Sequence, residues 1–270
     1  MSFARTIAIF TAVGSLAGAS HAQAQRLLSV DGQRASIHLE VTKPIVSRDG
    51  LFAGSRFATS VWDASLVLPL DRGPTLFARM GLAYASIEGL DDGLTLANPR
   101  VGAMVGGEGG RRRAEVHVDL PLATELGVDY ATGIGIFSEY EEFERFAKDS
   151  WSVGASASAE AEPGPGAFVG ARVGGTVLVP TSGDTDIFGL FSFYGDAPTD
   201  ESRFRLEFSG SVLASRTGVD FSARTAFFAS LEVAWPMTRF APAVFVRAPI
   251  DDTLDGTVAL VVGARLRVRG

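Results

Sequence analysis

Two histidines follow residue 24, and one of them lies beside carboxylates at a spacing that could support chemistry. Glu115, His117 and Asp119 alternate in one short segment, whereas His38 stands alone far upstream. Side chains two residues apart on a strand share a face but stand about 7 Å apart. Nucleophilic catalysis needs a nucleophile, a base and an orienting acid within hydrogen-bond reach. We therefore expect solvated histidines without a catalytic role.

Other kinds of chemistry find little support in the residue types. No Gly-x-Ser-x-Gly elbow follows residue 24, and the chain has no cysteine, which excludes thiolate nucleophiles, thiolate metal ligands and disulfides. The spacing of His38 and His117 does not indicate a metal site. The sequence predicts no catalytic residue, no metal site and no cofactor, and a lipid-modifying enzyme is the weakest function class that we retain.

The elements that would position these side chains are long segments in which apolar and polar residues alternate. In residues 203–213, for example, Phe204, Leu206 and Phe208 alternate with charged neighbours. This period of two is typical of strands. Collecting such segments predicts about twelve strands, at 33–43, 56–69, 74–87, 99–109, 111–122, 150–161, 166–179, 186–196, 203–214, 224–235, 239–248 and 256–268.

The length of these segments and the connections between them indicate a membrane barrel. Most are ten to fourteen residues long, whereas strands of soluble proteins have about five or six and tilted membrane-crossing strands about nine to eleven. Short turns rich in Gly and Pro alternate with longer loops, as in outer-membrane barrels. We predict an all-β fold, an antiparallel up-and-down transmembrane β-barrel. The alternative is a soluble β-sandwich or lipocalin-like barrel, with its apolar face inward.

The N-terminus has the pattern of a secretory signal peptide. Arg5 precedes an apolar run over 6–19, and Ala22-Gln23-Ala24 forms a cleavage site. A membrane anchor or an N-terminal core helix is the alternative. We expect residues 1–24 to be removed and residues 25–270 to form one domain. That domain carries 23 basic and 31 acidic side chains, because Arg5 is the one basic residue lost. The acidic excess argues against nucleic acid as a partner.

Three segments carry a family resemblance. They are Leu-Ala-Asn-Pro-Arg-Val-Gly-Ala-Met-Val at 96–105, Val-Leu-Val-Pro-Thr-Ser-Gly-Asp-Thr-Asp at 177–186, and 242–268, which begins Pro-Ala-Val-Phe-Val-Arg-Ala-Pro. Together they resemble the bacterial transporter-like outer-membrane β-barrels, including the phenol-degradation meta-pathway barrels. The resemblance implies passage of small, including hydrophobic, molecules, and it brings no catalytic residues.

A charged face on most strands would line the lumen if the apolar faces contact lipid. A charge facing lipid near the midplane costs about 2–4 kcal/mol, so charges should turn inward. These side chains either line a polar pathway or form ion pairs that close a narrow barrel. The lumen candidates are His38, Glu40, Asp63, Arg79, Glu115, His117, Asp119, Glu160, Arg172, Arg205, Glu207, Glu232, Arg247, Arg265 and Arg267.

The longest loop, 123–149, contains the one helical pattern after the N-terminal segment. Ser138 followed by Glu141 resembles a capping box, and aromatic residues then recur at helical spacing. We predict a short helix at 138–148, which either packs on the barrel rim or folds into the mouth as a constriction. The mouth candidates are Tyr140, Glu141, Phe143, Glu144 and Phe146.

The predicted function is that of an outer-membrane channel or transporter-like barrel for passage of a small molecule, hydrophobic and aromatic molecules included. A closed structural or adhesin-like barrel, whose outer loops bind a partner, is the main alternative. The expected partners are outer-membrane lipid, lipopolysaccharide and a small-molecule solute. Nothing in the sequence indicates the oligomeric state.

Overall fold

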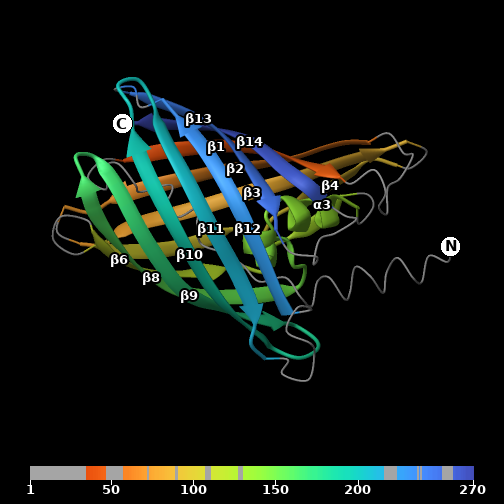
Figure 1. The fold of residues 1–270 in the computed structure, drawn as a ribbon. Helices are drawn as coiled ribbons and strands as arrows, with labels where there is room; N and C mark the ends of the chain where they lie inside the picture. The colour runs from red at the N-terminus through yellow and green to blue at the C-terminus, as the bar shows by residue number, and fades with distance from the viewer. Residues whose placement is uncertain are drawn as a thin grey trace.

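The computed structural model describes residues 35–46, 57–71, 73–88, 91–106, 111–126, 130–215, 224–235, 237, 239–250 and 258–270. The proposed signal peptide, residues 1–24, lies outside these residues. The described part is a barrel with a small helical segment within one end (Figure 1). None of its described helices is long and apolar enough to cross a membrane.

One antiparallel sheet makes the wall. Its strands are β1 (Ser36–Val46), β2 (Phe57–Pro69), β3 (Thr75–Ile87), β4 (Gly93–Leu96), β5 (Arg100–Gly106), β6 (Arg112–Asp119), β7 (Thr124–Leu126), β8 (Ser150–Gly164), β9 (Ala167–Pro180), β10 (Asp186–Pro198), β11 (Arg203–Leu213), β12 (Thr225–Ala234), β13 (Phe240–Pro249) and β14 (Val258–Arg269). The helical segment comprises α3 (Tyr130–Ser138) and the 3₁₀ helix η2 (Tyr140–Phe146).

The sheet closes on itself with twelve crossings, as predicted. β1 pairs with β2 on one side and β14 on the other. β4 and β5 both pair with β3 and act as one interrupted crossing, and β6 and β7 continue one another in the same way. The N–H of Gly270 donates to the carbonyl oxygen of Ala35 at 2.9 Å, so both ends of the described chain meet at the rim that carries the short turns.

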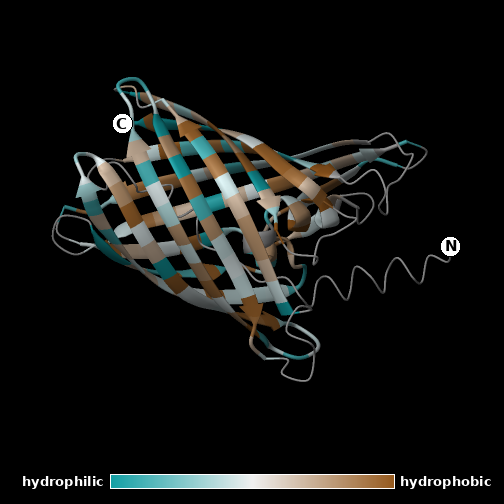
Figure 2. Ribbon diagram, in the orientation of Figure 1, coloured by the Kyte–Doolittle hydropathy of each residue, from teal (hydrophilic) through white to brown (hydrophobic). Residues whose placement is uncertain are grey.

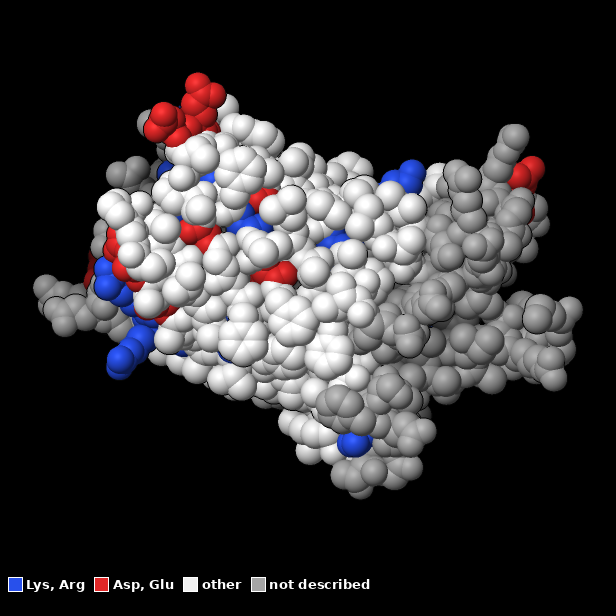
Figure 3. All heavy atoms as spheres, in the orientation of Figure 1, with Lys and Arg blue, Asp and Glu red and all other residues white. Residues whose placement is uncertain are grey.

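The apolar face of each strand points outward. Leu206 is 63 % exposed, whereas its neighbours Arg205 and Glu207 are 5 % and 2 % exposed. The same banding of hydrophobic and hydrophilic residues crosses the other strands (Figure 2). The side seen in Figure 3 carries few charged atoms between its ends. An apolar exterior around a polar interior is the arrangement of a membrane barrel and excludes the soluble alternative.

Two of the predicted strands, 99–109 and 111–122, cover only part of their crossings of the barrel wall. The first crossing also contains β4, before residue 99, and the second also contains β7, after residue 122. The ladder breaks at Ala97-Asn98-Pro99, where the Ala97 N–H turns to donate to the Gly81 carbonyl oxygen at 2.9 Å. Proline cannot donate to a ladder, which favours a break there. Beyond the break β7 pairs with β4 instead of β8, as Leu94 opposite Leu126 shows. The chain then passes into the barrel and returns to the wall at β8.

The predicted helix at 138–148 is displaced along the chain. Ser138 is the last residue of α3 instead of a cap, and no side chain caps the start of η2, so the capping-box prediction is wrong. Glu142 has φ −140° and ψ 35°, which interrupts the helix where the aromatic spacing predicted continuity. We call residues 130–147 the plug.

The plug occupies the bore instead of resting on the rim. Phe146 is fully buried among Val61 of β2, Ala83 and Ala85 of β3, and Ile134 of α3. A side chain at Gly135 would collide with the Phe146 ring, so the two parts of the plug pack closely only with glycine there. On the other side of the bore, Phe143 meets Phe188 of β10 edge to face at 5.2 Å.

Candidate functional site

Buried ion pairs join the plug to one half of the wall, beginning at Arg79 of β3. Its guanidinium donates to Asp63 Oδ2 on β2 at 3.0 Å and to Glu139 Oε2 at 3.1 Å. It also donates to Glu142 of η2. The side chains of Arg79 and its three partners are at most 5 % exposed. Arg79 thus neutralises charges from both the wall and the plug.

Arg100 of β5 makes a second set of bonds. Its Nε and Nη2 atoms donate to the two oxygens of Asp119 on β6 at 2.7 and 2.8 Å, a bidentate geometry that fits a guanidinium well. The same side chain donates to Glu142 Oε1 at 2.9 Å and to Glu144 Oε1 at 2.8 Å. Glu142 therefore bridges the arginines of two wall strands.

The plug also supplies a cation to the wall. Arg145 Nη2 donates to Asp63 Oδ1 at 2.6 Å, and a Cβ atom at Gly81 would meet both of these groups. The connected ion pairs contain three guanidinium groups and five carboxylates. We call these eight residues the ionic clamp: Arg79, Arg100, Arg145, Asp63, Asp119, Glu139, Glu142 and Glu144. Removing one partner from such a buried set strands a charge, which costs about 3–5 kcal/mol.

The plug carboxyl groups differ in the charge around them. Burial disfavours ionisation of Glu142, but Arg79, Arg100 and Arg145 hold its pKa at about 2. Burial raises the pKa of Glu139 to about 7 against the attraction of Arg79. Burial also raises the pKa of Glu144 to about 8, with Arg100 opposing. The ionic clamp has fewer cations than carboxyl groups, and Glu139 and Glu144 are the plug carboxyl groups whose negative charge the cations compensate least.

The opposite half of the bore is apolar at the level of the plug. Phe137 and Phe143 pack there against inward-facing side chains of β9, β10, β11, β12 and β14. These side chains are Leu178, Phe188, Leu213, Ala226, Phe228, Val258 and Val261. We call them the apolar wall. The plug therefore has one ionic face and one apolar face, each matched by the part of the barrel that it contacts.

The structure places the lumen candidates on the inner face of the wall. Thirteen are buried, and Glu160 and Glu232 are half-buried. Away from the plug they form separate ion pairs: Arg172 lies 3.2 Å from Glu115, and Arg265 lies 2.6 Å from Glu40 and from Glu232. Asp63, Arg79 and Asp119 join the ionic clamp. Of the mouth candidates, Phe143, Glu144 and Phe146 lie inside the barrel, whereas the side chains of Tyr140 and Glu141 are not described.

Several residues of the site were not among the candidates. Arg100 and Asp119 are direct partners in the β5–β6 register, so the alternation that identified Asp119 could also have found Arg100. Glu139, Glu142 and Arg145 carry no comparable signal, because their partners lie on strands far away in the sequence. Asn98, which is completely buried, was noted only as part of an Asn-Pro pair.

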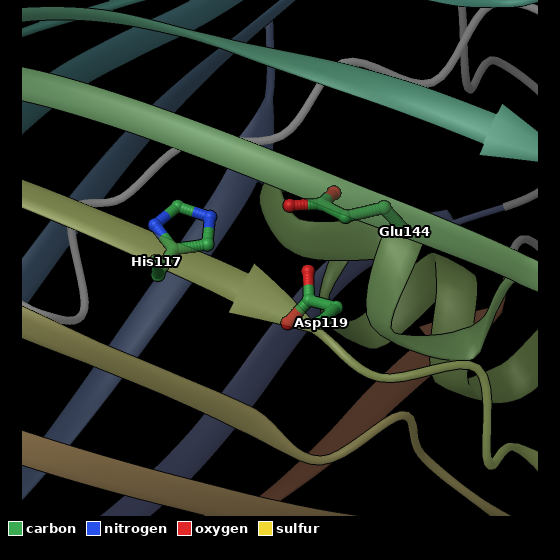
Figure 4. Close-up of side chains that lie close together, drawn as sticks. All are labelled: His117, Asp119 and Glu144. Carbon is green, nitrogen blue, oxygen red and sulfur yellow. The ribbon is translucent and has the colours of Figure 1, made fainter.

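The two histidines do not form a catalytic triad. Ser36 Oγ lies 3.0 Å from His38 Nε2, but no described residue forms a hydrogen bond with His38 Nδ1, and Arg267 stands opposite on β14. A triad needs an acid that orients the base. His117 lies instead with Asp119 and Glu144 in the one group of three metal-ligating side chains found among the described residues (Figure 4).

No family model matches the sequence, and no curated protein matches it. Solved structures share its fold. An outer-membrane channel from Pseudomonas putida F1 is 11 % identical with a TM-score of 0.53, over 88 % of this chain and 96 % of that one. LpxR from Salmonella typhimurium is 8 % identical with a TM-score of 0.51, over 86 % and 99 %. The translocator domain of the autotransporter NalP from Neisseria meningitidis is 10 % identical with a TM-score of 0.51, over 92 % and 95 %. The chain therefore has the fold of an outer-membrane β-barrel.

Proposed function

We propose that this barrel is a channel for small solutes in which the plug is the gate. The observation that carries the proposal is the construction of the plug. It is a single segment between β7 and β8 that fills the bore without being part of the sheet. Its displacement would leave the strand pairing of the twelve crossings intact. A barrel that only needed a filled interior could use wall side chains for that purpose.

The two faces of the bore suggest which solutes would pass. Displacing Phe137 and Phe143 would uncover the apolar wall, which includes the aromatic rings of Phe188 and Phe228. Apolar and aromatic side chains with a few polar groups are typical of small-molecule sites. The resemblance of the Asn98-Pro99 segment to phenol-degradation barrels agrees with this chemistry. We infer that the solute is small and hydrophobic or aromatic.

One observation favours a second candidate, the closed barrel whose outer loops bind a partner. The plug contacts both halves of the wall, which supports a bore that stays closed at this level. Such a barrel would keep this plug under all conditions. The two candidates therefore differ in whether the plug moves.

Conductance in planar bilayers distinguishes them. The comparison is between the natural chain and a variant in which a Gly-Ser linker replaces residues 130–147. A channel predicts small or intermittent conductance for the natural chain and a large, steady conductance for the variant. A linker replacing residues 181–185, another outer connection, is the matched control. Its conductance should have the size and the time course of the natural chain's conductance. Heat-modifiable gel mobility shows whether each barrel has assembled. A natural chain that never conducts, beside a conducting variant, would instead support the closed barrel.

A further inference from the structure

We propose that His117, Asp119 and Glu144 form a site for one divalent transition-metal ion, Zn²⁺ being the best fit, which joins the plug to the wall. His117 and Asp119 come from β6, and Glu144 comes from η2. Their ligand atoms all lie within 4.8 Å of one another, and all three residues are buried. In Figure 4 a nitrogen of the His117 ring faces the Glu144 carboxylate, with Asp119 completing the group.

The distances allow metal binding after a small movement. Ligands bound to Zn²⁺ at about 2.0–2.1 Å stand roughly 3.3 Å apart in tetrahedral geometry. The ligand atoms must therefore approach by about 1.5 Å at most. Asp119 and His117 are fixed by the ladder of β6, so η2 would supply the movement. A tighter plug would be the result.

Glu144 carries an observation that itself points to a missing ligand. Its Oε1 atom accepts a hydrogen bond from Arg100 at 2.8 Å. Its Oε2 atom is buried, and no described residue donates a hydrogen bond to it. An unsatisfied buried acceptor of this kind costs about 1–3 kcal/mol, and more when it is charged. A cation bound at Oε2 would satisfy this atom while Oε1 keeps its bond to Arg100.

The charge of the site agrees with a divalent ion. The ionic clamp holds five carboxylates and three guanidinium groups, an excess of two negative charges when all are ionised. One divalent cation supplies the two charges that the arginines leave uncompensated. Neutral imidazole adds a ligand without changing the balance.

The donor set favours Zn²⁺ over Ca²⁺ or Mg²⁺. Ca²⁺ takes 6–8 oxygen ligands and Mg²⁺ takes an octahedral set, whereas Zn²⁺ accepts one imidazole and two carboxylates with a fourth position open. His117 Nδ1 lies 3.5 Å from Glu115 Oε1. A carboxylate beside the second ring nitrogen is the usual means of orienting a metal-bound histidine. The sequence predicted no metal site because it compared only His38 with His117, which lie on β1 and β6.

Titration of the purified, folded protein with Zn²⁺ alone tests the site. After chelator treatment, isothermal calorimetry should show one Zn²⁺ per chain with micromolar or tighter affinity. His117→Ala and Glu144→Gln should each weaken binding at least tenfold. Glu162→Gln is the control for loss of a carboxylate, because this residue forms an exposed ion pair with Arg111 outside the ionic clamp. His38→Ala controls for loss of a lumen histidine, and both controls should bind Zn²⁺ like the natural chain.

Two results would overturn the proposal: no saturable binding by the natural chain, or equal binding by the His117 and Glu144 variants. The second would place any bound ion elsewhere in the protein. Should those variants fail to fold, Co²⁺ absorption of the natural chain decides. Intense visible bands indicate a tetrahedral site, and their absence contradicts it. Neither the Zn²⁺ titration nor the Co²⁺ absorption depends on conductance. Failure of the metal site can therefore be distinguished from failure of the channel proposal, on which the gating role of the plug rests.

Discussion

Asn98 donates a hydrogen bond from Nδ2 to the carbonyl oxygen of Ala147 at 2.8 Å, where the plug returns to the wall. The same nitrogen donates to the Glu144 carbonyl oxygen at 3.2 Å, and Oδ1 accepts from the N–H of Ala123 at 2.7 Å. The Asn98 N–H donates to the Arg145 carbonyl oxygen at 2.5 Å. One completely buried residue thus joins the C-terminal end of the plug to Ala123, which precedes β7.

Asn98→Asp should loosen the plug without disturbing the barrel. The aspartate keeps the acceptor for Ala123 but loses both Nδ2 donors, and it faces two carbonyl oxygens with a carboxylate. Leaving such buried groups unpaired costs about 1–3 kcal/mol. We expect faster hydrogen exchange in residues 139–147, more frequent channel openings and unchanged heat-modifiable mobility. Asn98→Gln keeps the amide and measures the effect of size alone. Unchanged exchange in the aspartate variant would show that Asn98 does not hold the plug.

A disulfide between β4 and α3 should lock the gate. Thr95 Oγ1 and Thr132 Oγ1 lie 2.9 Å apart, so sulfur atoms in place of these oxygens would lie within about 1 Å of the S–S bond length of about 2.05 Å. The chain has no cysteine, so Thr95→Cys/Thr132→Cys introduces a single possible bond. Oxidation should abolish channel openings, and a reductant should restore them. The two single variants should be indifferent to both treatments. Openings that persist in the oxidised double variant would mean that the gate is not at α3.

The wall could be predicted from the sequence because a membrane barrel imposes a period of two at every crossing. Residues 203–214 were predicted as a strand, and β11 is Arg203–Leu213. The first strand was predicted at 33–43, three residues earlier than β1 (Ser36–Val46). In the structure Pro44 lies within β1, opposite Val261. Small errors in strand bounds do not change which side chains point outward and which point inward, because that depends only on the alternation of apolar and polar residues.

The plug could be predicted only as a helix somewhere in the long loop. α3 contains Gly133 and Gly135 and is apolar on all sides, so it has no helical periodicity and little intrinsic helix preference. It forms because the barrel encloses it and Phe146 packs against Gly135. Residues 138–148 do have helical spacing, but buried ion pairs with β2, β3 and β5 decide their conformation. Such long-range pairing leaves no local pattern.

Leu206→Arg tests the facing of the wall. Leu206 is 63 % exposed on the outer face of β11, so an arginine there would lie in hydrocarbon. Near the midplane this costs about 2–4 kcal/mol. We expect a matching loss in the free energy of unfolding measured in lipid vesicles. Leu206→Phe keeps an apolar side chain and should cost less than about 1 kcal/mol, as apolar exchanges at exposed positions usually do. Equal costs for the two variants would contradict the assignment of the faces.

The last prediction concerns the pH dependence of the gate through Glu139. Burial raises its pKa to about 7 in the docked plug, from 4.5 in the absence of these contacts. The groups that face it are Arg79 of β3, which opposes the shift, and Asp63 of β2, Glu40 of β1 and Glu142 of η2, which add to it. A carboxyl group whose pKa rises on docking stabilises the docked state fully at low pH. That contribution disappears as the pH rises from 4.5 through about 7.

The open fraction of the channel should therefore increase between pH 5 and pH 8. Each unit of pKa shift corresponds to about 1.4 kcal/mol, so the increase should be at least about tenfold. Glu139→Gln fixes the neutral form of this residue and should reduce the pH dependence, leaving the part that the raised pKa of Glu144 contributes. Glu162→Gln removes a carboxylate of the exposed pair with Arg111 at the opposite rim, and it should retain the full pH dependence. Single-channel recordings at constant voltage and salt measure the open fraction of the natural chain and of the two variants. If the natural chain opens less as the pH rises, charge on Glu139 holds the plug instead of releasing it, and the assignment of the buried proton to this residue is wrong.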